Sequence, residues 1–130
     1  MLVALKRALV GTSAVVASLL LSSQAMAFQQ ANSGLVPNNG THAEYLTQRC
    51  ATYDGAPFQL VNSWPSAAVH MFIRDPSTNN PLGPTRDFPQ NDTGWRDMGD
   101  LGTNQCFMIT AWKDWTGFSG SEWWTGAIDY

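Results

Sequence analysis

The sequence predicts an all-β protein: a single small antiparallel β-sandwich, or an open barrel, closed by a disulfide between Cys50 and Cys106. Three observations support this fold class. Short runs with a two-residue alternation of apolar side chains are separated by clusters of Gly, Pro, Asn and Asp. Helical periodicity is almost absent. Two cysteines stand in a chain with an export signal, where one disulfide is the simplest arrangement.

Residues 1–27 are predicted to be a secretory signal peptide, separate from the fold. Lys6 and Arg7 precede an apolar stretch that is too short for a membrane span, and a small-x-small cleavage site follows at 25–27. Residues 28–130 then form one domain, secreted or periplasmic. Within it we expect the polar segment 28–41 to be an extended or mobile lead-in.

The charge balance of the predicted domain restricts its partners. Without Lys6 and Arg7 the chain keeps five of its seven basic side chains against ten acidic ones. This negative balance argues against nucleic acid and anionic membranes as partners. Two cysteines and the distant His42 and His70 are too few ligands for a zinc site, so we expect no metal and no cofactor. The oligomeric state is left open.

In the first half of the domain, turn residues separate two clear strands from a less certain segment. Segment 42–54 is a strand or an irregular stretch that delivers Cys50. The elements after it are a strand over 58–64, a strand over 67–75, and a loop with three prolines over 76–84.

The second half contains the strongest strand, residues 105–113. The other elements are a short strand at 85–88, an extended 95–98 with a turn at 99–102, a loop at 114–122 and a closing strand at 123–130. Both faces of 105–113 are largely apolar, so we expect it to be central and covered on both sides. Cys106 shares a face with Met108 and Trp112, which suggests that the segment around Cys50 packs over that face.

Tryptophan is unusually abundant, with six in the chain. A core of this size does not need six indoles, since each buries on the order of 150–250 Å². Trp123 and Trp124 are adjacent, and adjacent strand residues point to opposite faces. One of them therefore leaves the core, unless both sides of the strand are covered. Trp115 lies in a glycine-flanked loop, where burial is less expected.

Exposed indoles beside carboxylates and hydroxyls are typical of carbohydrate sites, where a sugar face stacks on the ring and polar groups bond its hydroxyls. We therefore expect non-catalytic glycan binding. The predicted ligand-binding residues are Trp112, Asp114, Trp115, Glu122, Trp123 and Trp124. The alternatives are a protein-binding effector or inhibitor that uses the 76–84 loop, and a membrane-active toxin.

Catalysis is less favoured by the sequence. It has no nucleophile elbow, no zinc-protease motif and no phosphate loop. Glu44 and Glu122 are the only glutamates, and the sequence does not bring any carboxylate pair together. We expect His70, beside Phe72 in a strand, to be a partly buried structural histidine.

Overall fold

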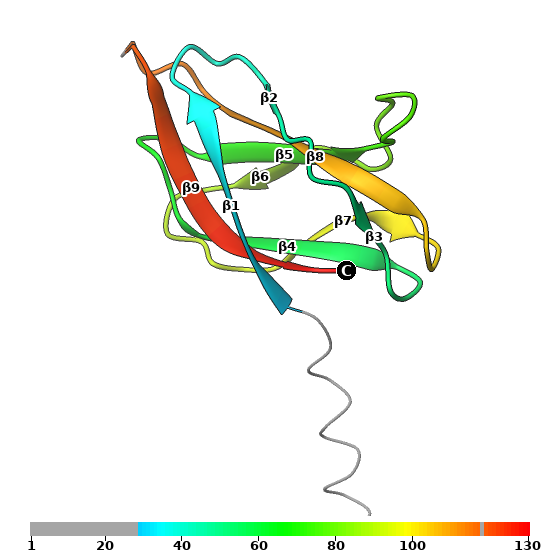
Figure 1. The fold of residues 1–130 in the computed structure, drawn as a ribbon. Helices are drawn as coiled ribbons and strands as arrows, with labels where there is room; N and C mark the ends of the chain where they lie inside the picture. Colours follow the sequence, from blue (N-terminus) through cyan, green and yellow to red (C-terminus); the bar gives the residue numbers. More distant parts are fainter. Residues whose placement is uncertain (1–28, 118) are drawn as a thin grey trace, which may run out of the picture.

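Antiparallel strands account for most of the described chain in the computed structural model, which describes residues 29–117 and 119–130 (Figure 1). The predicted signal peptide, Phe28 and Phe118 lie outside the described residues. The strands are β1 (Gln29–Pro37), β2 (Ala43–Glu44), β3 (Arg49–Cys50), β4 (Ala56–Ser63), β5 (Val69–Arg74), β6 (Arg86–Phe88), β7 (Arg96–Leu101), β8 (Cys106–Lys113) and β9 (Ser121–Asp129).

The strands form two sheets that pack face to face, which confirms the predicted fold class. Sheet 1 has the order β1-β9-β4-β7, and sheet 2 has the order β2-β8-β5-β6, with β3 also paired to β8. All pairings are antiparallel. Consecutive strands β8 and β9 lie in different sheets. The loop 114–120 therefore crosses from one sheet to the other at one end of the sandwich.

The core follows from the two-residue alternation of each strand. Inward positions are apolar and outward positions are mostly polar, so the two sheets bury their apolar faces against each other. Trp124 is fully buried on the inner face of β9, whereas Trp123 is 63% exposed on its outer face. The largest apolar core side chains are Trp124, Phe88, Phe107, Met71, Ile73, Met98, Ile109 and Ile128.

The segment predicted as a lead-in differs most from expectation. Residues 29–37 form strand β1, which pairs with β9 along its whole length. The two-residue alternation of apolar side chains does not reveal this strand, because its inward positions include Asn32 and Gly34. The Asn32 side chain donates to Gln59 Oε1 at 2.9 Å and accepts from Arg49 at 3.0 Å, which satisfies a buried amide. A side chain at position 34 would clash with the ring of Tyr45, so glycine suits this position.

The predicted turn at 99–102 is wrong in its first part, because β7 continues through Gly99 to Leu101. A Cβ at Gly99 would lie 3.0 Å from Ile73 Cδ1 and 3.2 Å from the carbonyl oxygen of Leu82. The glycine therefore permits close packing within a strand rather than a change of direction.

The predicted disulfide Cys50–Cys106 is present, but the segment around Cys50 does not cover the face of β8. Strand β3 pairs beside β8, and Cys50 lies directly opposite Cys106 with a Cα–Cα distance of 3.9 Å. Part of the outer face of β8 is covered instead by Arg74, which is 2% exposed and donates to Thr110 Oγ1 at 3.0 Å.

Candidate functional site

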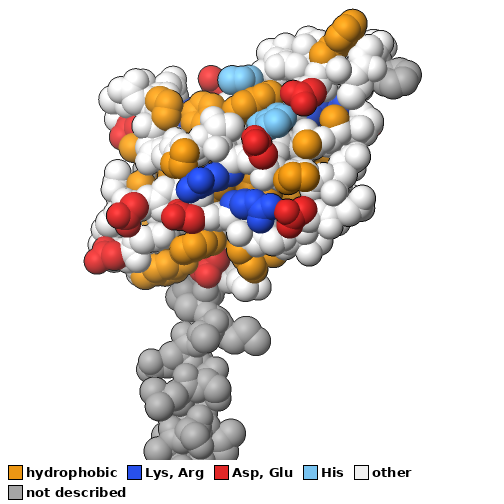
Figure 2. All heavy atoms as spheres, turned by 180° about the vertical axis from the view of Figure 1, so that it is seen from behind, with side chains coloured by type: hydrophobic (Ala, Val, Ile, Leu, Met, Phe, Trp, Pro, Cys, Tyr) orange, Lys and Arg blue, Asp and Glu red, His pale blue; other side chains and the backbone are white. Residues whose placement is uncertain are grey.

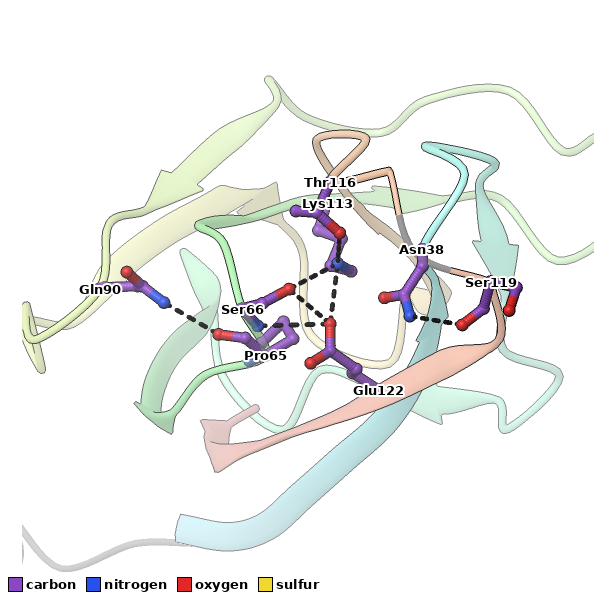
Figure 3. A network of polar contacts seen from close by, with 8 residues as sticks. All are labelled: Asn38, Pro65, Ser66, Gln90, Lys113, Thr116, Ser119 and Glu122. Carbon is purple, nitrogen blue, oxygen red and sulfur yellow. Dashed lines mark hydrogen bonds and ion pairs between the residues drawn. The ribbon is translucent and has the colours of Figure 1, made fainter.

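Lys113, the last residue of β8, anchors the crossing loop 114–120 from the interior of the sandwich. Its position continues the inward alternation of Ile109 and Ala111, so its side chain is fully buried. The ammonium donates to Ser66 Oγ at 2.9 Å and to Thr116 Oγ1 at 3.0 Å, and it lies 2.8 Å from Glu122 Oε2 (Figure 3). Its three donors are thereby satisfied, which a buried charge requires.

Glu122 belongs to this anchor. Its hydrogen bond with Lys113 and a second one from Ser66 Oγ at 2.6 Å lower the pKa of the carboxyl group. The carboxylate is therefore ionised at neutral pH and holds the start of β9 against the β4–β5 connection. Glu122 was predicted to bind ligand, yet the oxygen that faces Lys113 is already engaged by the protein.

Asn38 anchors the same loop from the other side. Its N–H donates to the Gly120 carbonyl at 2.9 Å, and its carbonyl accepts from the Thr116 N–H at 3.4 Å. Its side-chain amide, on a residue that is 5% exposed, donates to the Ser119 carbonyl at 3.2 Å (Figure 3). The loop is thus fixed at Thr116 and again where it enters β9.

Trp115 precedes the anchored Thr116 in this loop and is 72% exposed. Its backbone lies beside the turn that contains Gly40, which adopts a positive φ of 77°. Asp114, the residue before it, is also largely exposed. The loop therefore presents an open indole and a carboxylate next to each other on an anchored backbone.

Next to this loop, the outer face of sheet 2 carries a ring row, made of His42, Trp112 and His70. His70 is the direct cross-strand partner of Trp112, and the pairing of Ala43 with Ala111 places His42 on the other side. The centroid of the Trp112 ring lies 4.2 Å from that of His42 and 5.4 Å from that of His70, with interplanar angles of 24° and 25°. A histidine thus flanks each side of the indole, so Trp112 presents an edge rather than an open face to solvent.

Two carboxylates lie beside the ring row, and Figure 2 shows both histidines on one face, near acidic side chains. His70 Nδ1 lies 2.7 Å from Asp87 Oδ1, and Nε2 lies 3.3 Å from Asp114 Oδ1. His70 is partly buried, as predicted, and its hydrogen bond is to Asp87, whereas Asp114 lies near Nε2 without a hydrogen bond. Within the parts of the chain that the structure describes, no group of three or more His, Cys, Asp or Glu side chains is arranged to hold a metal ion.

The six predicted ligand-binding residues do not form one platform. Trp112, Asp114 and Trp115 lie at one end of sheet 2, where β8 passes into the crossing loop. Trp123 lies on the outer face of sheet 1, opposite Leu35 of β1. The prediction that Trp124 is an exposed ligand-binding ring is wrong, because Trp124 is fully buried and its Nε1 donates to Tyr45 Oη at 3.0 Å.

Four residues that shape the site are not among those predicted from the sequence: His42, Asp87, Asn38 and Lys113. His42 and Asp87 depend on strand pairing, which a single sequence does not give. Lys113 had a usable signal, since it continues the inward positions of the strongest strand.

Comparison with known proteins returned no matching family model, no matching curated protein and no matching solved structure. In residues 29–117 and 119–130, no helix is long and apolar enough to cross a membrane. The function therefore has to be argued from the site itself.

Proposed function

We propose that this protein is an exported, non-catalytic module that binds a neutral glycan through Trp115. The observation that carries the proposal is an indole that is 72% exposed on a loop anchored at both ends. A backbone that is anchored beside the ring loses little conformational entropy when a ligand binds, so more of the stacking free energy remains as affinity.

The groups around Trp115 support a sugar as the ligand. The apolar face of a pyranose can stack on the indole, while a carboxylate accepts hydrogen bonds from the hydroxyl groups. Asp114, the residue before Trp115, is exposed. Asp87 is exposed too, and lies on the opposite side of His70 from Asp114. These acids, with only five basic side chains against ten acidic ones in residues 28–130, disfavour an acidic polysaccharide and favour a neutral one.

Export is the second part of the proposal. A closed disulfide in a small domain fits an oxidising compartment, since cytosolic thiols are kept reduced. The predicted signal peptide at 1–27 supports the same destination, the periplasm or the outside of the cell.

The test uses the oxidised mature chain and a panel of insoluble neutral and acidic polysaccharides, with neutral liposomes alongside. Co-sedimentation and tryptophan fluorescence are recorded for the wild type, Trp115→Ala and Trp123→Ala. Trp123 is a matched control, because it is also a largely exposed indole but lies on the other sheet.

We expect saturable binding to a neutral polysaccharide, lost in Trp115→Ala and kept in Trp123→Ala. Binding that survives Trp115→Ala would refute the proposed site. Binding to liposomes alone would support a membrane-active protein instead.

The β5–β6 loop favours a protein inhibitor as a second candidate. The carboxylate of Asp75 accepts from the N–H groups of Ser77 and Thr78 at 2.7 and 3.0 Å, and its carbonyl accepts from Asn79 at 2.9 Å. These bonds fix an exposed loop in one shape, as inhibitors require. Capture of a partner by the wild type, abolished by a Ser77→Glu and Asn80→Glu double variant, would establish this role.

A further inference from the structure

Most of the sheet edges in the described chain are protected against pairing with another strand. Strand β6 has three residues and is followed directly by Pro89, and β2 and β3 have two residues each. The loop backbone at Gly83 packs closely against the backbone of Met98 in β7, the other edge strand of sheet 1. Short strands, proline and a covering loop are the usual devices that prevent edge-to-edge association.

Strand β1, at the remaining edge of sheet 1, carries none of these devices over most of its length. It has nine residues without a charged side chain, its only proline is the terminal Pro37, and its register with β9 has no shift. The strand order places β1 at the edge of sheet 1, where its one strand partner in that sheet is β9, and Figure 1 shows the two strands side by side. A long, regular and uncharged edge is a template for another strand.

Two hydrogen bonds identify the backbone groups that face outward. The N–H of Asn38 bonds to Gly120 of the β8–β9 loop, whereas the carbonyl of Leu35 accepts from Tyr45 Oη at 3.0 Å, away from β9. Backbone groups alternate between the two sides of a strand, so odd-numbered residues of β1 face the edge. Leu35 is capped by Tyr45, which leaves Gln29, Ala31 and Ser33 without a strand partner among the described residues.

We propose that β1 pairs with β1 of a second copy of this chain. The pairing is antiparallel about a two-fold axis at Ala31, with Gln29 of each copy opposite Ser33 of the other. The two four-stranded sheets would then form one continuous sheet of eight strands.

Charge and side-chain size favour a second copy as the occupant. The chain carries a net charge of −3, so two copies approach each other best where charge is absent, and β1 is uncharged. The outward side chains Ala31 and Ser33 are small, so they do not obstruct a strand that runs beside them. Antiparallel self-pairing of one strand also satisfies the two-fold symmetry of most homodimers.

The test measures sedimentation velocity of the oxidised chain over a concentration series, for the wild type, Ala31→Lys, Ala31→Glu and Ala127→Lys. The two-fold axis places like charges directly opposite each other in Ala31→Lys and in Ala31→Glu. We expect the dimer dissociation constant to rise about fivefold or more in each, and an equimolar mixture of the two to recover the dimer.

Ala127→Lys is the matched control, because Ala127 is the cross-strand partner of Ala31 on the interior strand β9. It should dimerise like the wild type. A wild-type chain that stays monomeric to millimolar concentration would overturn the proposal. A dimer that is unaffected by either substitution at Ala31, or that weakens equally in Ala127→Lys, would overturn it as well.

Discussion

Trp115 and Trp124 lie nine positions apart and are used in opposite ways. Trp124 is fully buried between the sheets, with its Nε1 bonded to Tyr45. Trp115 is largely exposed, although the backbone around it is fixed by Lys113 and Asn38. The difference shows that a side chain can be held in place without being buried. Core packing holds Trp124, whereas the buried polar residues Lys113 and Asn38 hold the backbone that exposes Trp115.

The largest effect should come from the buried indole. Trp124→Ala removes a fully buried ring, so we expect it to lower the free energy of unfolding by about 3–5 kcal/mol. Urea unfolding of the oxidised chain measures this loss. Trp123→Ala, its exposed neighbour, should change stability by less than about 0.5 kcal/mol. Equal losses in the two variants would contradict the assignment of Trp124 to the core.

The ion pair beneath the loop should have a smaller, pH-dependent effect. Glu122→Gln leaves Lys113 buried without its counter-charge, and we expect a loss of about 1–2 kcal/mol at pH 7, moderated because the carboxylate is partly solvated. The folded-state pKa of Glu122 is lower than the ordinary value of 4.5, so its contribution is complete above that pH. It disappears as the pH falls through the lower folded value.

Unfolding of the wild type and Glu122→Gln between pH 2 and pH 7 therefore gives two curves that converge in acid. Curves that remain parallel over this range would show that the Glu122 carboxylate contributes no charge-dependent stability.

The amide of Asn38 should affect the loop more than the core. Asn38→Ala removes the bond from its side chain to the Ser119 carbonyl and should cost about 1 kcal/mol of stability. Glycan affinity should fall too, because Trp115 would be less well positioned. Hydrogen exchange of the amides in loop 114–120 measures the loss of anchoring. Asn39→Ala, at the neighbouring exposed position, is the control. Equal exchange in both variants would contradict an anchoring role for Asn38.

The sequence was sufficient for the features that depend on local alternation. It predicted the fold class, the strands around 58–64, 67–75 and 105–113, the disulfide, and the opposite orientations of Trp123 and Trp124. Each of these follows from side-chain period or from cysteine chemistry, which neighbouring residues determine.

Features that depend on strand pairing could not be predicted in the same way. Strand β1 places Asn32 and Gly34 inward, where an amide network and the Tyr45 ring replace apolar packing. The ring row requires the register of three strands, so the sequence could identify Trp112 but not its cover by His42 and His70. The anchor of the crossing loop depends on Asn38, which is distant in sequence from Ser119.

The most direct test of the account is a paired measurement on one preparation of Trp115→Ala. It combines the free energy of unfolding with the dissociation constant for the polysaccharide that the wild type binds. We predict a stability within about 0.5 kcal/mol of the wild type and an affinity at least about tenfold weaker. A loss of several kcal/mol of stability would make Trp115 structural, and an unchanged affinity would remove it from the binding site.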